Sequence, residues 1–145
     1  MPCWHPAEAK EAARHPPAIL HPPKYGSVRW KSSYNYVGEI TYRDGILYAL
    51  RASSKTIGLI DSSNGTIIKS IETPAKDYFW RDGLRLISTE SHLFYSGADE
   101  TFAISLAKEG NPVVWQVPIG GKLAITPNNI LVISGDTDLH AYKLF

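Results

Sequence analysis

Aromatic side chains and one arginine gather in two short stretches of the chain, and these are the residues best suited to contact a ligand. An aromatic ring with a polar handle suits stacking on a sugar, a ring cofactor or a peptide side chain, and an arginine binds carboxylates well. The alternative role for such rings is to fill gaps between packed sheets, and the sequence leaves both roles open. The candidate ligand-binding residues are Tyr34, Tyr36, Tyr78, Trp80 and Arg81.

Potential zinc ligands occur in the N-terminal segment. Cys3 is the only cysteine, and His5, His15 and His21 accompany it. Structural zinc sites use tight, paired ligand spacings, which these residues lack. His15 and His21 instead begin two His-Pro-Pro copies, which favour an extended, polyproline-like arm. We therefore expect no metal site in this segment.

The other residues with chemical potential also have simpler structural explanations. Asp136-Thr-Asp138 could open a calcium loop, but two carboxylates without further oxygen ligands are typical of a hairpin turn. Gly120-Gly121 is followed by no helix that could bind a phosphate, and it is expected to form a flexible turn. His92 and His140 stand alone in strand-like runs, as packed or surface residues do. We expect no catalytic residue, no metal and no cofactor.

The overall composition fits one folded domain without a strong field of either charge. The 145 residues are 43% hydrophobic and 11% aromatic, which is enough to bury a core. Fifteen Lys and Arg against fourteen Asp and Glu give a formal net charge of +1, so no nucleic-acid or anionic-membrane partner is expected. No continuous apolar segment indicates a signal peptide or a membrane span, so a cytoplasmic location is the default expectation.

The chain changes character near Tyr25. Residues 1–24 are rich in proline and predict a flexible arm, with a short frayed helix over Ala7–Arg14. Residues 25–145 consist of short β-rich runs separated by Gly, Asn, Asp and Ser, which predicts an all-β body. Asn64-Gly65 is the strongest signal for a tight hairpin, because both residues tolerate positive φ.

The β-rich runs fall into sets of four antiparallel strands. The first set is Glu39–Tyr42, Ile46–Leu50, Thr56–Asp61 and Thr66–Ile71; the second is Leu84–Ser88, His92–Ser96, Thr101–Leu106 and Val113–Val117; the third is Leu123–Thr126, Ile130–Ser134 and Leu139–Leu144. A repeat of roughly 40 to 45 residues with four strands is typical of β-propeller blades, which need neighbours to bury their faces.

The repeats resemble those of the pyrroloquinoline-quinone-dehydrogenase-like propellers over about Tyr25–Phe145. The blades of that family end on Ala-x-Asp, a Gly turn and a strand Trp. The matching residues are Asp61 and Gly65 in the first set, Ala103, Gly110 and Trp115 in the second, and Ala141 in the third. The resemblance implies the architecture but not the quinone, because many relatives of that fold bind none.

The two ends of the repeated region complement each other. The third set lacks its fourth strand, while Val28–Lys31 reads as an unassigned fourth strand that could complete this set in the same chain or in a partner. About three blades are fewer than the usual four to eight, so two chains forming a six-bladed homodimer are expected. A fragment of a longer propeller is the other explanation.

Two classes of function follow from this interpretation. The leading expectation is a non-catalytic binding or scaffolding module that recognises a small molecule or a protein segment at its inter-blade loops. The alternative is a quinoprotein-like or hydrolytic enzyme, which needs polar groups in the central channel. The innermost predicted strands offer Glu39, Arg85 and Lys122 as the charged candidates.

Overall fold

The computed structural model describes residues 26–52, 54–73 and 84–144, and all regular secondary structure in these ranges is β-strand. The chain divides into two compact units, Met1–Lys31 and Ser32–Phe145. The expected helix at Ala7–Arg14 lies outside the described residues. Val28–Lys31 has no regular secondary structure, so the strand predicted there is not formed in this chain. In the described ranges, no helix is long and apolar enough to cross a membrane.

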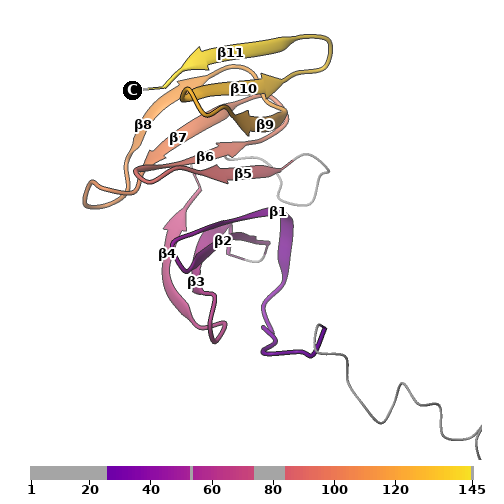
Figure 1. Ribbon diagram of the computed structural model, residues 1–145, viewed down its shortest axis with the longest axis vertical. Helices are drawn as coiled ribbons and strands as arrows, with labels where there is room; N and C mark the ends of the chain where they lie inside the picture. Colours follow the sequence, from indigo (N-terminus) through magenta and orange to yellow (C-terminus); the bar gives the residue numbers. More distant parts are fainter. Residues whose placement is uncertain (1–25, 53, 74–83, 145) are drawn as a thin grey trace, which may run out of the picture. The chain divides into compact units, whose positions relative to one another are not determined.

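The strands of the second unit form three antiparallel sheets (Figure 1). The first sheet contains β1 (Tyr36–Arg43), β2 (Ile46–Arg51), β3 (Thr56–Asp61) and β4 (Ile67–Glu72), in that order. The middle sheet contains β5 (Arg85–Ser88), β6 (His92–Ser96), β7 (Thr101–Ser105) and β8 (Val113–Val117). The third sheet contains β9 (Lys122–Ile125), β10 (Ile130–Ser134) and β11 (Leu139–Lys143). The strand sets predicted from the sequence are thus confirmed, with small shifts at their ends.

The tightest hairpin turn differs from the one predicted. Asp44 and Gly45 both have positive φ (50° and 84°) between the paired residues Arg43 and Ile46, as a two-residue turn requires. In the Asn64-Gly65 connection, only the glycine takes positive φ, and the loop is longer. The Asn64 side chain instead accepts hydrogen bonds from the backbone and hydroxyl of Thr66, which stabilises this wider turn.

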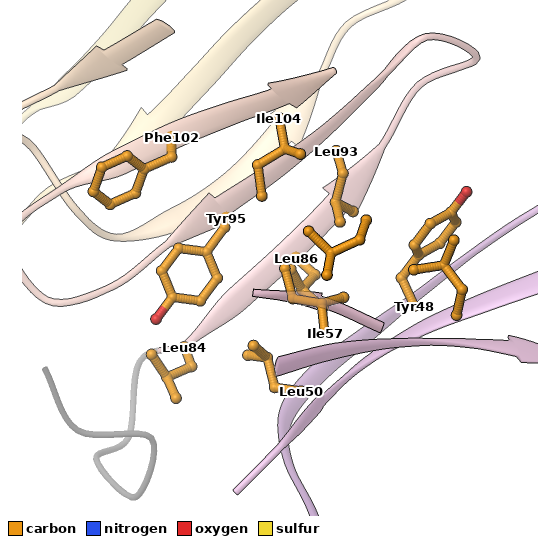
Figure 2. Close-up of a cluster of buried hydrophobic side chains, with 11 residues drawn as sticks. Tyr48, Leu50, Ile57, Leu84, Leu86, Leu93, Tyr95, Phe102 and Ile104 are labelled. Atoms are coloured by element: carbon orange, nitrogen blue, oxygen red, sulfur yellow. The ribbon is translucent and has the colours of Figure 1, made fainter. Parts of the chain in front are cut away.

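The first and middle sheets pack face to face through a single apolar cluster (Figure 2). Alternate residues of each strand point to the same face, so Leu50 and Ile57 from the first sheet meet Leu93 and Tyr95 from the middle sheet. The rings of Tyr95 and Phe102, on neighbouring strands, lie 6.1 Å apart. Burial of these side chains is the main stabilisation between the two sheets.

The middle sheet is also covered on its opposite face, by the third sheet. Phe94 and Ala103, which alternate with the residues of the first cluster, pack against Leu131 and Ile133 of β10. All five residues of β7 are buried as a result. Trp115 of β8 meets Tyr142 of β11 edge-on, with ring centroids 5.2 Å apart.

Hydrogen bonds hold the loop that joins the middle sheet to the third. Thr101 Oγ1 donates to the carbonyl of Ile119 at 2.6 Å, and the backbone N–H of Gly121 donates to Ser96 Oγ at 2.9 Å. The two hydroxyls also contact each other at 2.9 Å and are buried, so each polar group has a partner. The loop that was expected to be flexible is therefore anchored on the middle sheet.

The same loop requires glycine because backbone segments approach it closely. A Cβ atom on Gly120 would lie 2.1 Å from the carbonyl oxygen of Gly97, and one on Gly121 would lie 1.9 Å from that of Ser134. Neither distance is compatible with a side chain unless the backbone moves. The two glycines thus allow the turns of both sheets to contact the connecting loop.

Gly120→Ala should therefore destabilise the fold by about 3 kcal/mol or more, because the new methyl group must displace backbone. Gly97→Ala is the matched control, since a Cβ there has no atom within 4 Å, and it should change stability by less than about 0.5 kcal/mol. Urea unfolding monitored by tryptophan fluorescence measures both values. Equal stability of the two variants would contradict the close packing.

Candidate ligand-binding site

Two of the predicted ligand-binding residues lie together where β1 begins. Tyr34 and Tyr36 have ring centroids 6.4 Å apart in an edge-on arrangement. Arg51, at the end of β2, is paired in register with Tyr36. Its guanidinium carbon lies 4.1 Å from the centroid of the Tyr34 ring, which is a cation–π contact. Tyr78, Trp80 and Arg81, the other predicted residues, lie outside the described ranges.

Arg51 was not predicted from the sequence, although a charge at the end of the apolar strand Ile46–Arg51 was a usable signal. Leu50 faces the middle sheet, so alternation directs Arg51 to the opposite face of the first sheet. Atom Cδ of Arg51 and atom Cε1 of Tyr36 both lie close to Gly58. They are 3.5 and 3.7 Å from the position that a Cβ atom would take if Gly58 carried one. The two side chains therefore lie over the same point of the sheet.

This cluster contains polar atoms that the described part of the chain leaves unsatisfied. Arg51 Nε and Tyr36 Oη are buried and have no hydrogen-bond partner there. A buried donor without a partner costs about 1–3 kcal/mol. The cluster combines a guanidinium, a phenol and two aromatic faces, and it is chemically suited to a carboxylate.

A pocket of about 230 Å³ lies between the middle and third sheets, at the end of the strands where the loop through Gly120 enters β9. The β6–β7 turn, the β10–β11 turn and the loop through Gly120 line it together, and Asp99, Asp136, Asp138 and His140 contribute polar side chains. In the described ranges, no three His, Cys, Asp or Glu side chains gather as metal ligands. The acidic residues thus give this end of the third sheet a negative character.

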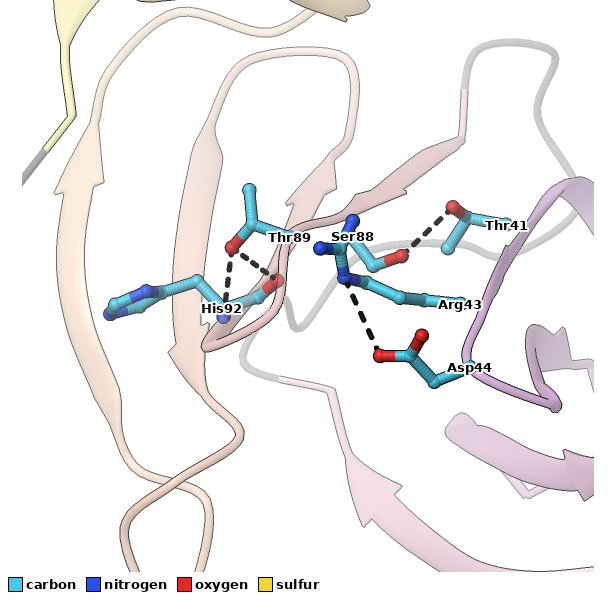
Figure 3. A network of polar contacts seen from close by, with 6 residues as sticks. All are labelled: Thr41, Arg43, Asp44, Ser88, Thr89 and His92. Carbon is cyan, nitrogen blue, oxygen red and sulfur yellow. Dashed lines mark hydrogen bonds and ion pairs between the residues drawn. The ribbon is translucent and has the colours of Figure 1, made fainter. Parts of the chain in front are cut away.

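A larger pocket, of about 480 Å³, lies at the opposite ends of the strands. Its apolar lining comes from Ile87, Phe94, Ile125 and Leu144. Its polar lining includes Arg43, Ser88, Thr89 and His92, whose contacts Figure 3 shows. A volume of this size suits a small ligand, and the sequence alone did not indicate the pocket because its walls come from all three sheets.

Polar contacts shape the wall of the larger pocket. Thr89 Oγ1 accepts a hydrogen bond from the backbone N–H of His92 at 3.0 Å and donates to its carbonyl at 3.3 Å. The ring atom Nδ1 of His92 lies 2.7 Å from Ser91 Oγ. Thr41 of β1 contacts Ser88 of β5 through their hydroxyls at 3.2 Å, which links the first and middle sheets. The hydroxyls thus mainly fix the β5–β6 turn.

The charged residues of the innermost strands partly neutralise each other. Arg85 Nε lies 3.2 Å from Glu39 Oε1, and Arg85 also donates a hydrogen bond from Nη1 to the carbonyl of Leu84. Because Glu39 is largely exposed, this ion pair contributes less than about 1 kcal/mol to stability. Lys122 begins β9 and is exposed. The pairing leaves Glu39 and Arg85 less available to hold a cofactor.

Burial, and secondly the positive charge of Lys108, lower the pKa of His92. The unfolded chain, with a histidine pKa of about 6.5, therefore binds more protons than the folded chain at pH values just below about 6.5. Stability should fall as the pH decreases through this window, and His92→Gln should reduce that fall. Urea unfolding between pH 7 and 5 tests this, with an NMR titration of the His92 ring. A ring pKa above about 6.5 would contradict the prediction.

Comparison with known proteins finds similarity at the level of structure. No family model matches the chain, and a search of curated proteins finds no relative. Hsv2 of Kluyvelomyces marxianus superposes with a TM-score of 0.53 at 15% identity, over 71% of this chain and 33% of that protein. BamB of Moraxella catarrhalis superposes with a TM-score of 0.59 at 13% identity, over 81% of this chain and 37% of that protein.

Both structures are β-propellers, and BamB is a propeller of the PQQ-like repeat type. This chain spans about a third of the length of each one. Identities of 13% and 15% establish the fold and not the activity. The three sheets of this chain are therefore β-propeller blades.

Proposed function

We propose that this chain is a non-catalytic β-propeller module that binds or scaffolds other molecules, and that two copies form a six-bladed ring. The observation that carries the proposal is an asymmetry among the blades. The middle sheet is covered on both faces, whereas the described packing covers one face each of the first and third sheets. A blade needs a neighbour on each face, so the two remaining faces are the surfaces for assembly.

Large apolar side chains are exposed on the outward face of the first sheet. Thr41 points to the middle sheet, where it contacts Ser88, so the alternate residues Ile40 and Tyr42 point away from it. They are 60% and 61% exposed, and Ile68 of β4 is 58% exposed. Ile40 and Tyr42 lie on β1 and Ile68 lies on β4, the two edge strands of the sheet. Exposed large apolar residues of this kind are candidates for contact with a partner.

The outward face of the third sheet complements this surface. Its central row is Ala124, Val132 and Ala141, which are paired across the three strands and give a flat apolar strip. Leu139, on the same face, is 73% exposed. The outer strand β11 pairs with β10 alone among the described strands, so its other edge can accept a further strand.

A second copy satisfies both surfaces at once. The third sheet of each copy would cover the first sheet of the other, and the two equivalent junctions would close a ring within the usual range of about four to eight blades. Further blades of a longer chain would cover the same faces, and this is the competing explanation. The two explanations cover the same two faces, and the mass of the protein in solution distinguishes them.

The ligand site of this module is proposed at the start of β1, where Tyr34 and Tyr36 contact each other, and at the connection that contains Tyr78, Trp80 and Arg81 in the sequence. A small molecule or a protein segment would stack on the rings.

The second candidate function is a quinoprotein-like or hydrolytic enzyme. The Glu39–Arg85 ion pair favours the binding module, because it occupies charges that a cofactor cradle would use. A stoichiometric chromophore or metal in the purified protein would favour the enzyme instead.

Sedimentation equilibrium at micromolar concentration should give twice the 16.1 kDa mass of one chain. Ile40→Lys or Leu139→Lys should shift the protein toward monomer, because each places a charge on an apolar contact surface. Glu109→Lys, on the exposed β7–β8 turn, is the control and should leave the mass unchanged. A wild-type monomer whose unfolding is independent of concentration would refute the ring.

A further inference from the structure

Arg51 is the most unusual charged residue of the described surface. It lies on the outward face of the first sheet, its guanidinium stacks on Tyr34, and its Nε is buried without a hydrogen-bond partner in the described ranges. A guanidinium held over a ring presents its remaining N–H groups in a fixed orientation, which suits a carboxylate. The structure thus predicts an acidic partner for this residue.

An acidic turn occupies the matching end of the third sheet. Asp136 and Asp138 lie in the β10–β11 turn, which the hydrogen bond from Gly135 N–H to the carbonyl of Asp138 closes at 2.9 Å. Both carboxylates are exposed, and neither has an ion pair with a described residue. At this end, Arg51 and Lys55 outnumber Glu72 in the first sheet, and Asp136 and Asp138 outnumber Lys122 in the third.

The observed junction between the middle and third sheets shows how such ends meet. There, the loop before β9 lies against the turn of the preceding sheet: a Cβ on Gly120 would be 2.6 Å from the backbone of Ala98. The turns of both sheets also line the pocket of about 230 Å³. At a blade junction, the loop leading into the inner strand and the turn of the preceding blade are thus direct neighbours.

Strand register identifies the equivalent positions at the junction that would close the ring, where a third sheet would precede a first sheet. Tyr36 and Lys122 are equivalent, because each begins an inner strand and pairs with the last residue of the next strand. Tyr34 therefore stands in the place of Gly120. Ser134 and Ser96 are equivalent because each ends the second strand of its sheet. Asp136 and Ala98 each come two residues later, so Asp136 takes the place of Ala98. A third sheet placed before a first sheet brings Asp136 beside Tyr34 and Arg51.

We propose that Arg51 of one copy forms a salt bridge with Asp136 of the second copy. This inference rests on the proposed homodimeric ring and names the contact that orients it. Pairing two first sheets would place like charges of Arg51 together, and pairing two third sheets would do the same with Asp136. The charges thus select the junction between unlike faces, which is the arrangement that closes a ring.

A charge exchange tests the contact in the full chain. Arg51→Asp and Asp136→Arg should each raise the dimer dissociation constant at least about tenfold, and the doubly exchanged protein should return to within about threefold of the wild type. Dimerisation of the wild type should weaken as the salt concentration increases. Glu109→Arg, on a turn at the other end of the middle sheet, is the charge-matched control and should have no effect.

The outcomes separate this inference from the ring itself. A wild-type monomer refutes the homodimer, and the contact with it. A wild-type dimer that neither single exchange weakens, or that the double exchange fails to restore, refutes the salt bridge alone. Because Arg51 is partly buried, Arg51→Gln provides a milder variant if Arg51→Asp does not fold. Asp136→Arg alters an exposed turn, so it tests the contact independently of folding.

Discussion

Burial of the middle sheet on both faces is the constraint on which the rest of the structure depends. Leu93 and Tyr95 pack toward the first sheet, while Phe94, between them in the sequence, packs toward the third. A sheet with two apolar faces is stable only between two neighbours, because exposure of either face would lose most of its hydrophobic stabilisation. The described packing covers one face each of the first and third sheets, and the proposed assembly would cover the other two.

Close backbone approach at the junctions determines where functional groups can lie. Gly120 and Gly121 bring the connecting loop into contact with the turns of both sheets, and the hydroxyls of Ser96 and Thr101 satisfy the polar groups of that loop. Tyr34 takes the position before β1 that Gly120 takes before β9. Gly120 permits close backbone contact, whereas the ring of Tyr34 stacks on the guanidinium of Arg51. The same position in the repeat thus allows close backbone packing in the third sheet and carries an aromatic ring in the first.

Many polar groups of the candidate sites are engaged with each other. The hydroxyls beside the larger pocket mainly fix the β5–β6 turn, and the charges of Glu39 and Arg85 are directed at each other. Arg51 Nε and Tyr36 Oη are buried without a hydrogen-bond partner in the described chain, as is Arg85 Nε, whose contact with Glu39 is an ion pair. In the proposed ring, Arg51 would meet its acidic partner at the junction with the second copy.

The sequence by itself determined the strand sets, their period and two members of the aromatic cluster, Tyr34 and Tyr36, because strand alternation and turn residues are local signals. The tertiary structure decided which turn takes two positive φ values, left Val28–Lys31 without a strand, and brought Arg51 to the cluster. These features depend on register and on packing between sheets. The Asp44-Gly45 turn and the charge of Arg51 had local signals, but register and packing between sheets decided how they were used, because both couple residues that are distant in sequence.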